Sequence, residues 1–248
     1  NIPMPHQALR NINLPLEIDT LLIRNGYVRY EEQTGEEPGS LFFDRFETTI
    51  TGLDFPVREL SPGNSSADAI NVKGTARLMG QGRLGFDMVL WPVHPRDSFQ
   101  LTARLNTMNL QSINPMLTRL IPVSIRTGMV DSLNIKSFHA NRLSSNGVME
   151  LGYHNLNLQL LPLRPDLFHR IEREFLSEIA NLVLPLANPN RTGNFRHGII
   201  HYQRDSTRGF FNYIWKSALS GIKSTAGSET ETQKQIRKRK AVNRAKDN

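Results

Sequence analysis

The sequence predicts a mainly β protein of the α+β class, in which an antiparallel, strongly curved β-sheet forms a groove and amphipathic helices cap it toward the C-terminus. Three observations predict this fold. Apolar and polar residues alternate through 82–107, most strand-like runs follow one another without a helix that could form a parallel crossover, and helical spacing gathers after residue 165. We expect a lead-in over 1–15, one folded domain over 16–228 and a basic, disordered tail over 229–248.

The clearest signal lies in residues 82–107, where two alternating runs flank a proline-containing reversal at 92–97. One face of each run is apolar and the other is polar or charged, which predicts an antiparallel strand pair with one buried face. The apolar row consists of Leu84, Phe86, Met88, Leu90, Phe99, Leu101, Ala103 and Leu105.

The N-terminal part predicts further strands of the same sheet. A hairpin is expected in which strands over 16–23 and 27–30 flank a turn at Asn25 and Gly26, because both residues tolerate positive φ. The next strands are expected over 41–53, with Phe42, Phe46, Thr48 and Ile50 on one face, and over 69–79.

The C-terminal strands are expected over 123–141, as one strand or as two with a break near Thr127 and Gly128, over 146–161 and over 196–204. In the strand over 146–161 the apolar positions change phase between Tyr153 and Leu156. A β-bulge at His154 and Asn155 would bring both sets onto the same face. The apolar candidates in this strand are Met149, Leu151, Leu156 and Leu158.

Three helices are predicted to close the sheet, over 112–121 with Pro115 in its first turn, 166–184 and 210–222. For the last one, three roles stay open: an ordinary core helix, a helix in a membrane interface, or a plug at one end of an apolar groove. The candidates for the cap or interface are Phe211, Ile214 and Trp215.

Composition narrows the classes of function. The chain has no cysteine, which excludes disulfides and thiolate metal sites. Residues 229–248 hold seven Lys or Arg against three Asp or Glu, so this tail contributes +4 of the net +7 and leaves +3 for residues 1–228. Because the basic residues gather in a tail without an apolar pattern rather than on a structured face, no nucleic-acid partner is predicted.

No motif predicts catalysis. The G-x-G-x-x-G frame at 80–85 leads into a strand, whereas a dinucleotide site needs a helix there, so we interpret it as a turn. His197, His201 and Asp205 share one strand face, but two imidazoles four strand residues apart are separated by about 13 Å, too far to share one metal ion. We therefore expect no enzyme activity, no cofactor and no metal.

Two segments resemble the C-terminal region of the AsmA-like envelope biogenesis family. Residues 145–158 contain the pattern N-G-x-M-x-L-x-Y-x-x-L-x-L, and residues 211–223 are similar to the closing segment of some members. The stretch Leu22–Tyr30, an apolar run followed by N-G, resembles the recurrent strand unit of the same family. The resemblance implies a periplasmic, outer-membrane-biogenesis module with a β-groove, associated with the inner membrane through an anchor outside this chain.

The resemblance also implies a function, namely binding or conducting phospholipid acyl chains between the inner and outer membrane. If the helices cover the apolar rows completely, the protein is an ordinary α+β domain; if they cover only the ends, an acyl chain is the natural occupant. The alternatives are an envelope scaffold that binds another protein through a sheet edge or helices, and a hydrolase or transferase with a non-standard site. The predicted groove residues are Leu84, Phe86, Met88, Leu90, Phe99, Leu101, Leu105, Met149, Leu151, Leu156 and Leu158.

Overall fold

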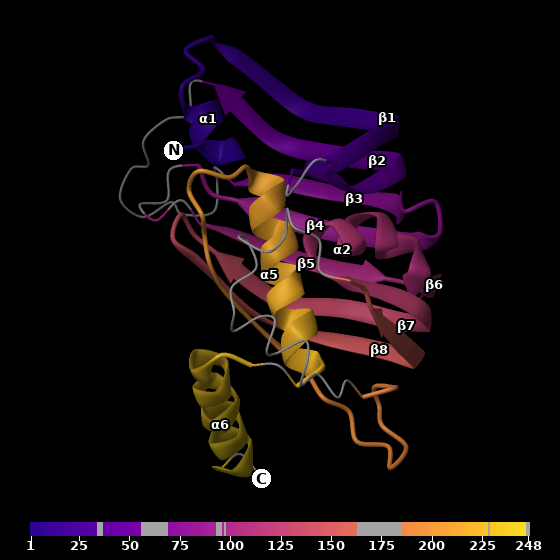
Figure 1. Ribbon diagram of the computed structural model, residues 1–248. Coiled ribbons are helices and arrows are strands. Elements are labelled where there is room, and N and C mark those ends of the chain that lie inside the picture. Colours follow the sequence, from indigo (N-terminus) through magenta and orange to yellow (C-terminus); the bar gives the residue numbers. More distant parts are fainter. Residues whose placement is uncertain are drawn as a thin grey trace.

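The protein is built on one antiparallel sheet of nine strands, which confirms the predicted fold class. The computed structural model describes residues 1–33, 37–55, 69–92, 96, 98–162, 185–227 and 229–246. Within these ranges the strand order is β1-β2-β3-β4-β5-β7-β8-β9, and the short β6 pairs with β7. Because nearly every strand pairs with the one before it in sequence, the sheet is a meander, and its two ends do not meet (Figure 1).

The strands are β1 (Leu16–Glu32), β2 (Gly39–Phe55), β3 (Ile70–Leu78), β4 (Gly82–Leu90), β5 (Phe99–Leu105), β6 (Met108–Asn109), β7 (Val123–Ala140), β8 (Ser144–Leu160) and β9 (Gly198–Gln203). The helices are α1 (Pro5–Arg10), the 3-10 helix η1 (Leu110–Ile113), α2 (Asn114–Leu120), α5 (Phe210–Thr225) and α6 (Glu231–Lys246).

The strand pair predicted at 82–107 is confirmed as β4 and β5. Phe86 lies opposite Ala103 and Met88 lies opposite Leu101. The glycine-rich frame before β4 is a tight turn, since Met79 and Gly80 have φ values of 53° and 70°. It leads from β3 into β4, as predicted, and not into a helix.

The hairpin predicted at the N-terminus is wrong, because β1 is one continuous strand of 17 residues. Asn25 has a φ of 51°, and the pairing of β1 with β2 changes register on both sides of Gly26. The same backbone freedom that suits Asn-Gly to a hairpin turn serves a β-bulge here. The bulge bends the strand without reversing it.

A second bulge changes the predicted face of β2. Arg45 has a φ of 48° and the register of β2 with β3 shifts between Asp44 and Glu47. Phe43 rather than Phe42 therefore lies opposite Leu78, which packs in the core. The prediction that Phe42 and Phe46 share a face is wrong for this reason.

The bulge predicted in β8 is confirmed. Asn155 has a φ of 53°, and the register with β7 shifts in this region. Leu151 and Leu156, which have opposite parity in the sequence, pack in the same apolar cluster as a result.

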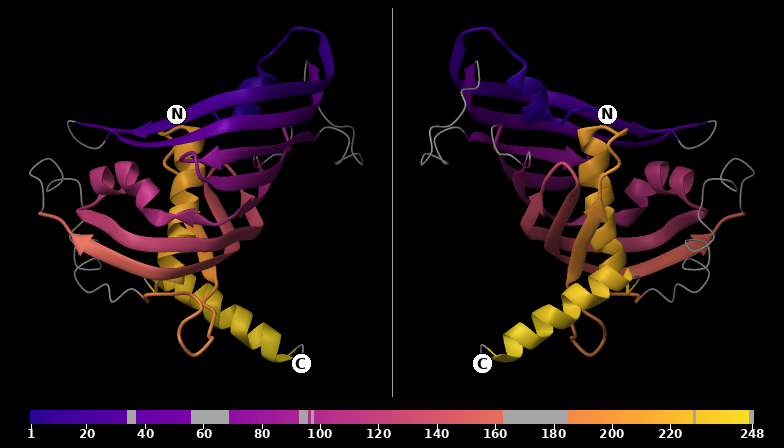
Figure 2. Two further views of the ribbon diagram at one scale, coloured as in Figure 1. Left: turned by 90° about the vertical axis from the view of Figure 1, so that its right-hand side faces the viewer. Right: turned by 90° about the vertical axis from the view of Figure 1, so that its left-hand side faces the viewer.

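The helices lie mainly on one side of the sheet. Figure 2 shows the sheet curving around α5, and α5 contacts β9 and β8 most extensively. Helix α2 packs against β2 and β7, close to the predicted 112–121, while Met4 at the start of α1 is buried in the main apolar cluster. The helix predicted over 166–184 falls outside the described residues. None of the helices in the described ranges is both long enough and apolar enough to cross a bilayer.

The C-terminal tail is not the disordered extension that was predicted, because residues 231–246 form α6. A capping box begins this helix: Gln233 accepts a hydrogen bond from the Thr230 backbone, 3.0 Å, and its own backbone N–H donates to Thr230 Oγ1, 3.2 Å. The Gln233 side chain also donates 2.6 Å to the Ile199 carbonyl on β9. Polar contacts rather than an apolar stripe hold α6 against β9, and for this reason the hydropathy pattern did not predict the helix.

Candidate functional site

The candidate site is the inner face of the sheet, which we define as the face that carries Phe86, Leu101 and Met149 and that packs against α5. One cross-strand row of this face can be followed from β1 to β9 through the strand registers. We call it the central row, and it consists of Ile23, Thr48, Gly74, Phe86, Ala103, Ile135, Met149 and Gly198.

Burial along the central row does not change evenly between its two ends, because Thr48 on β2 is buried, at 4% exposed. Met149 is completely buried and Ile135 is 7% exposed, whereas Phe86 and Ala103 are only half-buried. At the opposite end Ile23 is 38% exposed. The central row is therefore buried on β7, β8 and β9 and again on β2, half-buried on β3, β4 and β5, and exposed at Ile23 on the edge strand β1.

Between β1 and β4 the central row carries only small residues, Thr48 on β2 and Gly74 on β3. A Cβ built on Gly74 would lie 2.7 Å from Cζ of Phe86 and 2.6 Å from Oγ1 of Thr48, so the Phe86 ring covers Gly74. This ring also stacks on Phe46 at 5.7 Å between centroids. The ring thus forms a flat apolar surface over the middle of the row.

The structure separates the predicted groove residues into two groups. Those on β5, in the first half of β8 and at the last position of β4 are buried, whereas the others on β4 and those at the end of β8 keep some exposure. The buried group is Leu90, Phe99, Leu101, Leu105, Met149 and Leu151, and the half-buried group is Leu84, Phe86, Met88, Leu156 and Leu158.

The predicted cap on α5 is only partly correct. Ile214 packs against the main apolar cluster, and Trp215 is half-buried with its indole Nε1 enclosed. Phe211, however, is 49% exposed and does not face the sheet. The helix turns a different stripe to β9 and β8: its buried residues are Asn212, Tyr213, Ser217, Gly221, Ser224 and Thr225.

Small residues on that stripe let α5 approach the sheet closely. Ser217 hydrogen-bonds Ser145 of β8, 2.7 Å between the hydroxyl oxygens, and Gly221 lies against Ile200 and Met149. Tyr213 donates its hydroxyl to the Asn141 carbonyl at 3.1 Å, and burial raises its pKa above the ordinary value. Ser217, Gly221 and Thr225 recur at four-residue spacing and are the sequence signal for this face, which apolar periodicity does not register.

The beginning of α5 reaches the other end of the sheet. Asn212 donates to the Tyr30 hydroxyl of β1 at 3.0 Å, and Lys216 pairs with Glu32 at 2.9 Å. Burial, opposed by the hydrogen bond from Asn212, raises the pKa of Tyr30 to about 12. Helix α5 therefore spans the mouth of the curved sheet from the end of β1 to β9, rather than covering only its ends.

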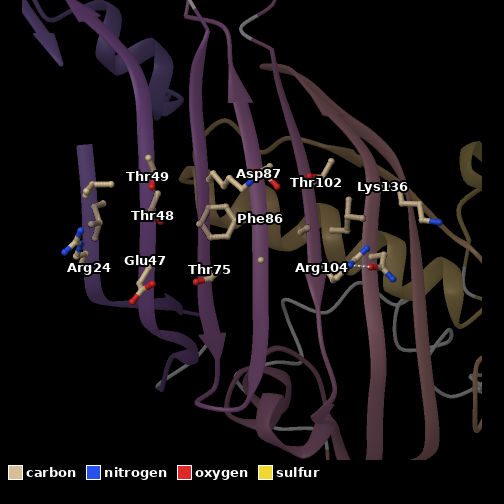
Figure 3. A pocket seen from close by; sticks show the side chains of 18 residues that line it. Arg24, Glu47, Thr48, Thr49, Thr75, Phe86, Asp87, Thr102, Arg104 and Lys136 are labelled. Atoms are coloured by element: carbon tan, nitrogen blue, oxygen red, sulfur yellow. Dashed lines mark hydrogen bonds and ion pairs between the residues drawn. The ribbon is translucent and has the colours of Figure 1, made fainter. Parts of the chain in front are cut away.

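The outer face carries a shallow polar groove of about 790 Å³ that crosses β1 to β7. Figure 3 shows its side chains in two rows, with Thr49, Asp87 and Thr102 in one and Glu47 and Arg104 in the other. Several of its charges are already paired: Lys73 lies 3.6 Å from Asp87, and Arg104 donates to Asn134 at 3.0 Å.

Within the described ranges, no group of three or more His, Asp or Glu side chains lies close enough together to hold a metal ion. His201 is engaged across the strands instead, with Nδ1 2.7 Å from Oδ1 of Asn146. In comparisons with known proteins, no family model, no curated protein and no solved structure matches the chain.

Proposed function

We propose that this chain is a non-enzymatic, lipid-binding module of the cell envelope that holds a phospholipid acyl chain against the half-buried part of its inner face. The observation that carries the proposal is the middle of the central row, where Phe86 and Ala103 stay partly accessible while Met149 is 0% exposed. Apolar side chains that stay partly accessible on this face leave a surface that favours an apolar ligand over water.

The side chains that would contact the acyl chain are those left half-buried between α5 and β1. Leu84, Phe86 and Met88 project from β4 onto this surface, and Ile23 lies at its outer limit. An acyl chain has no hydrogen-bonding groups, so shape and apolar contact suffice to bind it. The likeness of residues 145–158 and 211–223 to AsmA-like proteins favours the same ligand and a periplasmic location, with an inner-membrane anchor outside this chain.

A charged side chain placed on this surface tests the proposal. Ile23→Asp puts a carboxylate on the inner face of an edge strand, where the fold tolerates it best because the position is already exposed. Leu22→Asp is the matched control: Leu22 is the next residue, is 51% exposed, and points to the outer face.

The readout is titration of delipidated protein with a phospholipid that carries a fluorescent acyl chain. We expect saturable binding by the unaltered chain and by Leu22→Asp, and at least a tenfold weaker affinity for Ile23→Asp. Equal affinity for all three proteins, or no binding by any, would rule out the inner face as the lipid site.

A second candidate function is an assembly scaffold that binds another protein through a sheet edge. The specific observation in its favour is the exposed edge of β1, where every residue from 19 to 25 is exposed. Disulfide crosslinking from this edge, described below for a second copy of the chain, tests whether the edge binds a protein partner independently of lipid.

A further inference from the structure

The two edge strands of the sheet, β9 and β1, differ in whether other parts of the chain bond to their free backbone groups. On β9, the Ile199 and His201 N–H groups donate to the hydroxyls of Ser224 and Ser220, at 2.9 and 3.2 Å. Gln233 donates to the Ile199 carbonyl, and Arg237 donates to the His197 carbonyl at 2.7 Å. Side chains of α5 and α6 thus satisfy the edge of β9 and leave no room for another strand.

The edge of β1 has no such cover in the described part of the chain. Strand β1 is 17 residues long and pairs there with β2 alone. Its middle is aliphatic and exposed: Leu21, Leu22 and Ile23 are 40%, 51% and 38% exposed. A long, apolar edge strand is a template for pairing with another chain, and natural proteins usually protect such an edge.

The charges along β1 favour a second copy of the same strand, running antiparallel. Glu17 and Asp19 precede the aliphatic centre and Arg24 follows it. Antiparallel pairing centred on Leu22 sets Arg24 opposite Thr20 and Asp19 opposite Asn25, so no like charges oppose each other, whereas parallel pairing in register would set each charge beside its own copy. A two-fold axis perpendicular to the sheet produces this arrangement and uses the same surface on both copies.

We infer that two copies of this chain pair through β1, antiparallel and centred on Leu22, to form one continuous sheet. This register sets Leu22 opposite Leu22 on the outer face, and Leu21 opposite Ile23 on the inner face. The inner faces of the two copies then adjoin, with the α5 helix of each copy on the same side of the continuous sheet. The pairing depends on the edge and its charges, and it does not require that a lipid be bound.

The absence of cysteine makes the test direct, since each engineered thiol is the only one in the chain. Directly opposed residues of an antiparallel pair have Cα atoms about 4.5–5.5 Å apart, within the range that a disulfide bridges. Leu22→Cys is the test variant, and Thr102→Cys, exposed on the outer face of the central strand β5, is the matched control.

Both variants are oxidised in a glutathione redox buffer, and the unaltered chain is measured in parallel by light scattering. The inference expects a dimeric mass for the unaltered chain, a disulfide-linked dimer of Leu22→Cys, and none of Thr102→Cys. A monomeric mass at all accessible concentrations, or equal crosslinking of the two variants, overturns it.

The lipid proposal and this inference fail separately. Leu22→Asp disrupts the pairing but leaves the inner face unchanged, so it is expected to be monomeric and still to bind the fluorescent lipid. A monomer that binds lipid removes only the inference, and a dimer that binds none removes only the proposed function.

Discussion

Gly198 of β9 and Gly221 of α5 lie against each other at the point where the helix meets the sheet. A Cβ built on Gly198 would touch the Gly221 carbonyl and lie 2.5 Å from Oγ1 of Thr225. A Cβ on Gly221 would lie 2.8 Å from Cγ1 of Ile200. Two residues without side chains therefore set the distance between α5 and β9, and this distance determines how closely α5 covers the inner face beside β9.

Gly198→Ala is expected to destabilise the protein by about 1–3 kcal/mol, because the methyl group meets backbone and a buried hydroxyl that cannot move away easily. Gly85→Ala is the control, since a Cβ there meets nothing within 4 Å and alanine suits a strand interior better than glycine. Urea unfolding of both variants measures the difference. Equal stabilities would mean that α5 is not seated as closely as described.

Gln233→Ala is expected to release α6 from β9, because it removes the donor that satisfies the Ile199 carbonyl and leaves that group buried. The cost is about 1–3 kcal/mol for an unsatisfied buried group. Amide hydrogen exchange should show faster exchange at Ile199 and through residues 231–240.

Gln235→Ala is the matched control for this variant, since Gln235 is exposed on the same helix. Unchanged exchange in Gln233→Ala would show that α6 does not depend on this contact.

The attachment of α6 is expected to weaken in acid because it depends on ionised Glu229. This side chain, 5% exposed, accepts hydrogen bonds from Arg237 at 2.6 Å and Ser224 at 2.7 Å and pairs with Arg196 at 2.9 Å. Burial opposes its ionisation, but the hydrogen bonds from Arg237 and Ser224 outweigh burial and lower the pKa of Glu229 below 4.5. A lowered folded-state pKa stabilises the fold above pH 4.5, and this contribution is lost as the pH falls through the lowered value.

The measurement is the stability of the unaltered chain and of Glu229→Gln between neutral pH and the acid limit. Glu229→Gln should be less stable at neutral pH, and the difference should shrink below pH 4.5. A difference that stays constant with pH would contradict this role for Glu229.

The sequence was most informative where one face of a strand is buried, because alternation then fixes both strand and face. Strands β4 and β5 and the bulge at Asn155 follow from this pattern. The pattern failed where backbone conformation decides the outcome. Asn25 and Arg45 both adopt positive φ within strands. The alternation of apolar residues does not distinguish a bulge from a turn at Asn25, and it gives no sign of a bulge at Arg45.

The candidate site was predicted less completely than the fold. The sequence identified the apolar row that contains Phe86 and Met149, but the degree to which α5 covers it depends on the small stripe of Ser217 and Gly221, which hydropathy does not register. For the same reason Phe211 was assigned to the interface and is instead 49% exposed. Local pattern determines which residues face inward, and tertiary packing determines which of them stay accessible.

Native mass spectrometry of the gently purified chain, followed by organic extraction, tests the central claim most directly. The account predicts a mass increment equal to a whole number of phospholipids, recovered in the extract and reduced in Ile23→Asp but not in Leu22→Asp. A bare polypeptide mass and an extract without lipid, from cells and after incubation with phospholipid, would contradict it.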